Sequence, residues 1–477
     1  MSGRLATALV FGSSFCILVL EILAGRLLAP IIGVSLETFT GIIGTVLAGI
    51  ALGNAAGGWW ADRRDPDTAI GPIFVLAGLT TWLAPLVASV LQPVQAADPF
   101  TIVIASAVTF VAPAALLATI TPLVAKLQLQ DLEETGRTVG NLSAAGTAGA
   151  LAGTFATGFV LVGRVPTRPL IVVIGAILLA VGVAWLGRRV LRANVAAAAF
   201  IVLVGLGALV VPSPCDAETA YACAQFVTDP ERPTGVRVVL NGDSNSYLDL
   251  EDPSYLGFRY LRLFDAVFDE QPGGPWQVAH VGGAGLTIPR YIDAERPGSA
   301  QTVLEIDGEL IDAVADNLGV EPGPTTEMVI GDARLSLAAL GTDTHDVVVG
   351  DAFSGLTVPW HLTTSEFMAE VDRILTDDGL YIMNLIDGGD VAFARAEMAT
   401  LAEHFDHLQV IVPPGGVNAD GAARNFVLVA SDTALPPPAV ADDDGILLDA
   451  AETEAFFADA EVLRDDFAPV DQLRRLG

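Results

Sequence analysis

The chain has 477 residues, more than one hydrophobic core usually serves, so two or three domains are expected. Hydrophobic residues make up 52% of it, but its charges are unevenly spread. Residues 1–212 carry 11 basic and 9 acidic side chains, whereas the remaining 265 residues carry 13 basic and 47 acidic ones. An acidic C-terminal part of this kind excludes nucleic acid as a partner, because phosphate binding requires a basic surface.

The N-terminal part contains seven apolar stretches that approach the roughly 20 residues needed to cross a bilayer. They lie near residues 6–28, 38–60, 69–91, 100–125, 140–162, 169–187 and 194–212. The first is not read as a cleavable signal peptide, because it contains Glu21 and Arg26 and further spans follow. These two charges either pair within the bundle or mark a function there. We predict a helical membrane domain over residues 1–212, with the lipid bilayer as a partner and a multi-pass location in the cell membrane.

The loops between these stretches differ in positive charge. Arg63, Arg64, Lys126, Arg137, Arg188, Arg189 and Arg192 follow the second, fourth and sixth stretches, and only Arg164 and Arg168 stand clearly in the other loops. Because arginine and lysine accumulate on the cytoplasmic side, seven spans place the C-terminal domain outside the cytoplasm. Cys215 and Cys223 lack a CxxC or His-rich companion, so they favour a disulfide in an oxidising space over a zinc site.

The C-terminal part is read as a linker (213–232), an α/β domain (233–432) and an acidic segment (433–477). A β-hairpin comes first, with strands at 236–240 and 247–250 around Asn241-Gly242-Asp243, a strong turn signal. Further strands are predicted at 277–281, 302–306, 328–330, 347–350 and 379–385, and helices at 288–293, 309–317 and 365–375. Strands that alternate with helices predict a doubly wound parallel sheet.

Four of these strands end in residues suited to one ligand. The first strand runs into Gly282-Gly283-Ala284-Gly285, where glycines let the backbone approach a ligand. The next ends at Glu305, whose carboxylate can accept hydrogen bonds from both ribose hydroxyls of an adenosine ligand. The last two end in Gly331-Asp332-Ala333 and Gly350-Asp351-Ala352. Each acid alone is more simply a solvated loop residue or a helix cap, but together they favour an S-adenosyl-type ligand in one crevice.

The hairpin, the glycine turn, Glu305, Asp332 and Asp351 resemble the spermidine synthase family of aminopropyltransferases, in particular its membrane-fused bacterial and archaeal branch. The resemblance covers about residues 233–430, and the ending 463–471 is similar to endings in that branch. It implies a Rossmann-like fold of the class I S-adenosylmethionine type, without a metal. The residues it implies for cofactor binding are Gly282, Gly283, Gly285, Glu305, Asp332 and Ala333.

The resemblance also implies individual roles. Glu305 would bind the ribose, and Asp332 the adenine or its neighbouring sugar edge. Asp351 would be the catalytic base that takes a proton from the attacking amine. Asn245 stands where the family has a substrate-side Gln, and Tyr260 where its Tyr meets the polyamine.

Three positions depart from the family. Gly285 and Ser354 stand where the family has Asp, and Arg262 stands where it has Glu. A polyamine carries at least two positive charges, and carboxylates must offset the cost of desolvating them. The departures therefore argue against putrescine as the acceptor, but not against the adenosyl ligand.

Three functions follow from these patterns. The first is a membrane-anchored aminopropyltransferase-type enzyme with decarboxylated S-adenosylmethionine or S-adenosylmethionine as co-substrate and a small amine as acceptor. The second is an S-adenosylmethionine-dependent methyltransferase. The third is a non-enzymatic transporter or sensor that binds a polyamine or nucleoside-like ligand. A homo-oligomer is compatible with all three.

Overall fold

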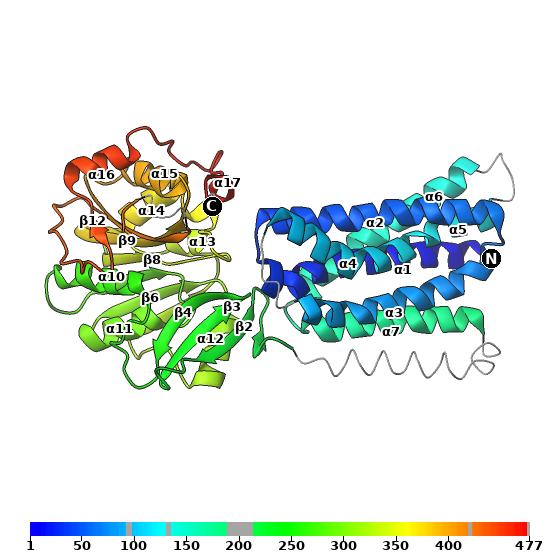
Figure 1. Cartoon of the computed structure of the whole chain (residues 1–477), viewed down its shortest axis with the longest axis horizontal. Coiled ribbons are helices and arrows are strands. Elements are labelled where there is room, and N and C mark those ends of the chain that lie inside the picture. Colours follow the sequence, from blue (N-terminus) through cyan, green and yellow to red (C-terminus); the bar gives the residue numbers. More distant parts are fainter. Residues whose placement is uncertain (92–97, 130–134, 188–212, 418–421, 475–477) are drawn as a thin grey trace. The chain divides into compact units, whose positions relative to one another are not determined.

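The computed structural model describes residues 1–91, 98–129, 135–187, 213–417 and 422–474. The chain divides into two compact units, Met1–Cys223 and Ala224–Gly477. The first is built of helices and the second of strands and helices (Figure 1).

The first unit contains long apolar helices. Within the described residues six helical stretches are long and apolar enough to cross a membrane, the fourth formed by α4 and α5 together. They overlap the first six expected spans, whereas the seventh, 194–212, lies outside the described residues. The elements are α1 (Gly3–Ile32), α2 (Leu36–Arg63), α3 (Asp67–Leu91), α4 (Pro99–Ala118), α5 (Ile120–Gln128), α6 (Thr135–Ala156) with the π-helical turn η2 (Thr157–Leu161), α7 (Thr167–Leu186) and the short strand β1 (Ala217–Glu218).

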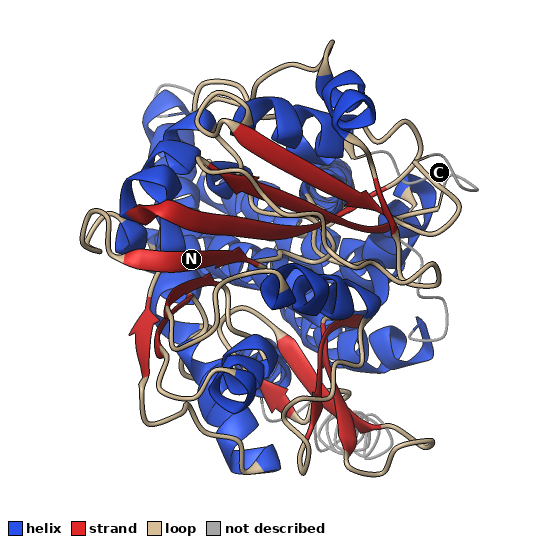
Figure 2. Cartoon of the chain, turned by 90° about the vertical axis from the view of Figure 1, so that its left-hand side faces the viewer, coloured by secondary structure: helices blue, strands red, loops and turns tan. Residues whose placement is uncertain are grey.

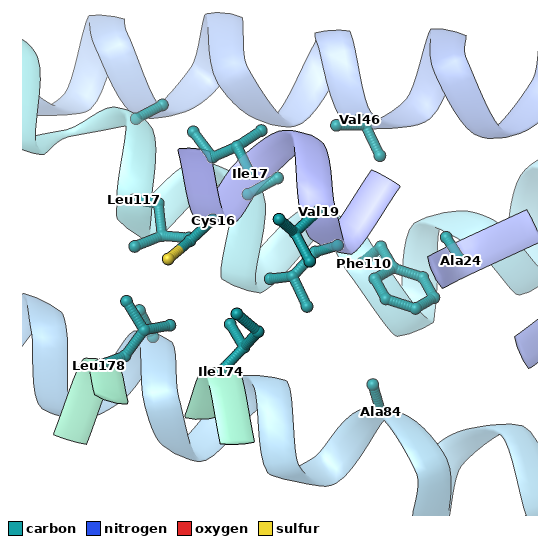
Figure 3. Close-up of a cluster of buried hydrophobic side chains, with 14 of the residues drawn as sticks. Cys16, Ile17, Val19, Ala24, Val46, Ala84, Phe110, Leu117, Ile174 and Leu178 are labelled. Carbon is teal, nitrogen blue, oxygen red and sulfur yellow. The ribbon is translucent and has the colours of Figure 1, made fainter. Parts of the chain in front are cut away.

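Helix α1 forms the centre of this unit. Its buried side chains meet those of α2, α3, α4 and α7 in one apolar cluster, which Figure 3 shows around Cys16, Val19, Phe110 and Ile174. Close approach of neighbouring helices requires glycine, because a Cβ atom at Gly149 of α6 would lie 2.2 Å from the carbonyl oxygen of Phe11. Small residues at helix interfaces allow such contacts in membranes.

Arg26 of α1 pairs with the segment that follows the helices rather than with Glu21. Its guanidinium donates hydrogen bonds to Glu218 Oε1 (3.2 Å), to the carbonyl oxygen of Ala220 (2.9 Å), to that of Thr219, and to Thr167 Oγ1 (3.1 Å). Glu218 therefore neutralises the charge of Arg26, and oxygen atoms of the first unit accept the hydrogen bonds of its guanidinium. Of the two interpretations, this bonding matches pairing with a polar group on a neighbouring span, here Thr167 of α7, and Glu218 beyond the helices is a further partner.

The segment 213–232 is more ordered than a linker. Cys215 and Cys223 form a disulfide, and residues Cys223–Thr228 form strand β2. The expected hairpin consists of β3 (Gly235–Leu240) and β4 (Asp243–Asp249), and β2 pairs with β3 in antiparallel register from Ala224↔Leu240. The expectation of a linker missed β2, which satisfies the backbone groups on the free edge of β3.

An eight-stranded sheet forms the body of the second unit, in the order β12-β10-β11-β9-β8-β5-β6-β7. Strands β5 to β9 run parallel, and β10, β11 and β12 extend the sheet with antiparallel pairs. The strands are β5 (Gln277–Val281), β6 (Ala300–Glu305), β7 (Thr326–Ile330), β8 (His345–Gly350), β9 (Leu375–Asp387), β10 (His407–Val412), β11 (Arg424–Ser431) and β12 (Ile446–Leu447).

Helices connect these strands, as Figure 2 shows in blue beside the strands in red. Alternate residues of β8 enter two different cores, since Val347 and Val349 pack with α10 and α11 whereas Val348 packs with α14 and α15. Burial of both faces is typical of a parallel sheet. The helices are α10 (Arg259–Asp269), α11 (Thr287–Glu295), α12 (Gly308–Leu318), α13 (Ala333–Leu337), the 3₁₀ turn η3 (Trp360–Leu362), α14 (Ser365–Ile374), α15 (Ala392–Leu401), α16 (Ala450–Phe457) and α17 (Val470–Leu473).

The acidic segment 433–477 is part of this α/β body. It supplies β12, α16 and α17, and its side chains Phe456, Leu463 and Val470 are buried in the same core as α14 and α15. Its negative charge therefore lies on an ordered, packed segment whose apolar residues cover the sheet.

Candidate active site

The glycine turn and Asp351 meet where the winding of the sheet reverses. Strands β5 and β8 are parallel neighbours, with β6 and β7 on one side and β9 on the other. Gly282 follows β5 with a φ of 95°, and a Cβ atom there would lie 2.7 Å from the carbonyl oxygen of Asp351. Only glycine fits both conditions without strain. Ligands of such sheets bind at this reversal, beyond the carboxyl ends of the strands.

Glu305 at the end of β6 faces the glycine turn. Its Oε2 accepts a hydrogen bond from the backbone N–H of Gly283 (2.8 Å), and its Oε1 accepts one from Asp307 (2.9 Å). Burial raises the pKa of Glu305, while these two backbone donors lower it. The backbone N–H of Ala284 is a third donor to this carboxylate, which has about four lone-pair sites, so acceptor capacity remains for a ligand hydroxyl.

Asp332 at the end of β7 already has partners. Its Oδ1 accepts a hydrogen bond from the backbone N–H of Arg334 (2.9 Å) and so caps α13, in which Ala333 is buried. Its Oδ2 lies 3.3 Å from Nε2 of His361. The capping role that was the simpler alternative for Asp332 is present, and a ligand would have to share this carboxylate with His361.

Asp351 at the end of β8 is held by two side chains from other elements. The Tyr260 hydroxyl of α10 donates a hydrogen bond to Oδ2 (2.8 Å), and Asn384 Nδ2 of β9 donates one to Oδ1 (2.9 Å). Burial raises the pKa of Asp351 to about 6, although the bonds from Asn384 and Tyr260 act in the opposite direction. A carboxylate with a pKa close to neutrality is a better base than an exposed one.

The side chain of Asp351 opens onto a cavity of about 160 Å³. Asn245 and Tyr260 line the same cavity, so the structure brings together the predicted base and both predicted substrate-side residues. Oδ1 of Asn245 is buried and accepts no hydrogen bond from the residues that the structure describes.

The three departures from the family differ in their consequences. A Cβ atom at Gly285 would lie 2.5 Å from Ser246 Oγ, so the site has no room for an acid at that position. Arg262 forms a salt bridge with Asp444 (2.5 Å) and is not among the cavity-lining residues. The argument that Arg262 brings a positive charge into the acceptor site is therefore wrong, because Asp444 binds it elsewhere.

Several cavity residues were not predicted from the sequence, namely Asp243, Arg259, Asn384 and Asn425. Asn425 donates to Asn384 Oδ1 (2.9 Å), which orients the Asn384 amide so that its nitrogen points to Asp351. A lone amide in the apolar run Leu380–Leu385 was the available signal for Asn384. No sequence signal distinguished Asp243, because Asp is common in turns such as Asn241-Gly242-Asp243.

Ligands for a metal do not gather in the described residues, where no group of three or more His, Cys, Asp or Glu side chains is suitably placed. The polar groups at the cavity are amides, a phenol, a guanidinium and carboxylates. Such groups can orient and deprotonate an organic substrate.

Sequence comparison relates part of the chain to known enzymes, although no family model matches the chain. It is 27% identical over 141 residues to a polyamine aminopropyltransferase of Vibrio vulnificus, which covers 29% of this chain and 46% of that protein. It is also 27% identical over 145 residues to a polyamine aminopropyltransferase of Neisseria meningitidis serogroup A, with coverage of 30% and 54%. The chain thus spans about half the length of the curated relatives it matches.

Structure comparison aligns the chain with solved structures. A probable spermidine synthase from Corynebacterium glutamicum aligns with a TM-score of 0.48 and 26% identity, over 52% of this chain and 95% of that one. Human methyltransferase-like protein 13 in complex with SAH aligns with a TM-score of 0.32 and 20% identity, over 45% and 99%.

Proposed function

We propose that this spermidine synthase-like chain is a membrane-anchored aminopropyltransferase-type enzyme, in which Asp351 is the base for an attacking amine. The observation that carries the proposal is the position of Asp351. It lies at the reversal of the sheet, beside the glycine turn and on a cavity that Asn245 and Tyr260 also line. The sequence similarity to polyamine aminopropyltransferases supports the same reaction class.

The proposed ligand at the glycine turn is S-adenosyl-type. Gly283 and Glu305 would meet its ribose, since backbone donors hold the Glu305 carboxylate and leave acceptor capacity for a hydroxyl. Asp332 would lie at the adenine side, one strand further along the sheet.

In the proposed reaction the amine nitrogen attacks the carbon that carries the sulfonium sulfur. The new N–C bond forms as the C–S bond breaks, and the electron pair of that bond neutralises the sulfonium to a thioether. The proton released by the nitrogen passes to Asp351. Fixed placement of the two reactants and a general base account for the catalysis, and Tyr260 and Asn384 hold the base in position.

The membrane location is part of the proposal. Six described helices have the length and composition of spans, and glycines allow them to pack closely. The Cys215–Cys223 disulfide is consistent with the extracytoplasmic placement inferred from loop charges, because disulfides persist in oxidising compartments.

The test is product analysis with the purified full chain. We expect decarboxylated S-adenosylmethionine and a panel of primary amines to yield one N-aminopropyl product and an equal amount of 5′-methylthioadenosine, as detected by mass spectrometry. Formation of S-adenosylhomocysteine from S-adenosylmethionine, with a methylated product, would instead establish a methyltransferase. Tight ligand binding without any product would support the transporter or sensor. Failure to bind any adenosyl ligand would contradict the proposal.

A further inference from the structure

Asp243 is a carboxylate in the candidate cavity that the proposed chemistry does not use. It begins β4, directly after the turn residues Asn241 (φ 53°) and Gly242 (φ 98°), and it lines the same cavity as Asp351. In a site for a diamine, a second carboxylate of this kind would offset the charge of the ammonium group that does not react.

Arg474 does not line this cavity itself but contacts the turn that does. It follows α17, its side chain is 9% exposed, and its Nη1 donates a hydrogen bond to Thr357 Oγ1 (2.8 Å). Thr357 closes a short turn with Ser354, whose N–H donates to the Thr357 carbonyl oxygen (2.8 Å), and the residues between them, Gly355 and Leu356, line the cavity. The C-terminal segment therefore brings a buried positive charge to the acceptor side of the site.

The charge of Arg474 needs compensation, because Nε and Nη2 are buried and have no hydrogen-bond partner among the described residues. Three carboxylates interact with it electrostatically, those of Asp387, Asp243 and Asp471. Asp387 is fully buried and accepts backbone hydrogen bonds from Gly388 (2.8 Å) and Ala394 (2.9 Å), and Asp471 is exposed on α17. Only Asp243 of the three lines the cavity.

We propose that the positive charge of Arg474 balances the Asp243 carboxylate, as the second ammonium group of a diamine would otherwise do. The acceptor would then be an amine with a single nitrogen. This inference rests on the proposed function. Arg474 interacts electrostatically with Asp243 and is joined through Thr357 to the turn that lines the cavity, so a distal ammonium would be repelled by a guanidinium of the same sign next to the cavity. Arg259, which also lines the cavity, adds a second positive charge.

Acids are also absent from the two positions, 285 and 354, where the family has Asp and where a carboxylate could offset a distal ammonium. Gly285 has no space for a side chain against Ser246, and Ser354 belongs to the turn that Arg474 holds through Thr357. The positive charge of Arg474 and the lack of space for an acid at Gly285 therefore both favour a monoamine over a diamine.

The experiment compares two probes that differ only in the second nitrogen, 1,4-diaminobutane and 1-aminobutane. Their affinities for the full chain are measured by calorimetry, and the result is the ratio of the two dissociation constants. For the unaltered protein we expect 1-aminobutane to bind at least tenfold more tightly. Arg474→Gln should reduce this preference about tenfold or more, and Arg474→Lys, which keeps the charge, should change it by less than about threefold.

Two further variants make the result specific. Arg464→Gln removes a positive charge from the same C-terminal segment, where Arg464 pairs with Glu403 (2.5 Å), and should leave the preference unchanged. Asp243→Asn should increase the preference for 1-aminobutane, because Arg474 then lacks its counter-charge at the cavity. If Arg474→Gln does not fold, as judged by its melting temperature, the change in binding preference caused by Asp243→Asn alone tests the inference.

An unchanged preference in a folded Arg474→Gln variant, or in Asp243→Asn, would overturn the inference, and so would tighter binding of the diamine by the unaltered protein. Product analysis separates this outcome from failure of the proposed function. Transfer to an amine without the expected shift in preference refutes only the role of Arg474. The expected shift without any transfer refutes only the enzymatic proposal.

Discussion

The Tyr260 hydroxyl and the Asp351 carboxylate are joined by a hydrogen bond of 2.8 Å, although 91 residues separate them in the chain. Burial and the negative charge of Asp351 raise the pKa of Tyr260 well above 10, so the tyrosine keeps its proton and donates. Above a pH of about 6, the pKa of Asp351, the carboxylate accepts this bond in its ionised form, which is the form that a base requires.

The first prediction concerns the pH dependence of transfer. Because the pKa of Asp351 is about 6, kcat/KM should rise about tenfold per pH unit below 6 and level off above it, after correction for the free-base fraction of the amine. Tyr260→Phe removes a donor that stabilises the carboxylate, so the midpoint should move to higher pH. Tyr255→Phe, on the partly exposed loop before α10, is the matched control and should leave the midpoint in place. A profile in Tyr260→Phe identical to that of the unaltered protein would show that Tyr260 does not tune the base.

The second prediction separates the base from a structural cap at Asp351. Asn keeps a carbonyl oxygen but cannot accept the proton, so Asp351→Asn should lower turnover by about 10²–10⁴-fold while donor affinity stays within about twofold. Retention of full activity would rule out the assignment.

The melting temperature of Asp351→Asn also has an expected sign. The folded pKa of Asp351 lies above its ordinary value of 3.8, so the native state favours the protonated form and loses that stabilisation as the pH rises through about 6. At pH 8 the neutral Asn should be at least as stable as the charged Asp. A marked drop in melting temperature at pH 8 would instead favour a structural role.

The third prediction tests Glu305 as the ribose ligand. Charge-assisted hydrogen bonds contribute about 1.5–3 kcal/mol each, so Glu305→Gln should weaken binding of an S-adenosyl ligand by about tenfold or more. Glu327→Gln, on the exposed face of the neighbouring strand β7, provides the control and should bind as before. Calorimetry with S-adenosylmethionine and its decarboxylated form measures both. Equal affinities in the two variants would remove Glu305 from the site.

The fourth prediction concerns sidedness. A cysteine at exposed Glu231 should react in intact cells with a membrane-impermeant thiol reagent, whereas a cysteine at exposed Asp65, between α2 and α3, should react only after lysis. The native cysteines interfere little, because Cys16 is buried and the other two form the disulfide. The opposite labelling pattern would place the α/β domain in the cytoplasm, where adenosyl sulfonium donors are made.

Local sequence patterns were sufficient for the long apolar helices and for the ends of the parallel strands, but not for β2 or for the elements after β9. Apolar stretches of about 20 residues predict long helices, since length and composition are local properties. The glycine turn, Glu305, Asp332 and Asp351 could be assigned to strand ends because each stands after an apolar run and before a helix. Parallel topology then requires these ends to lie along one edge of a sheet, as they do in the structure.

Only the tertiary structure showed which further side chains join Asn245, Tyr260 and Asp351 at the cavity. Asn384 and Asn425 come together through antiparallel pairing of β9 with β11. Arg262 forms a salt bridge with Asp444, 182 residues away. Asp243 and Arg474 stand near opposite ends of the α/β domain sequence, in a turn and after a short helix, so no periodicity links them. Such contacts depend on chain-wide packing, which brings distant residues together, whereas periodicity and turn chemistry report only on neighbours within a few residues.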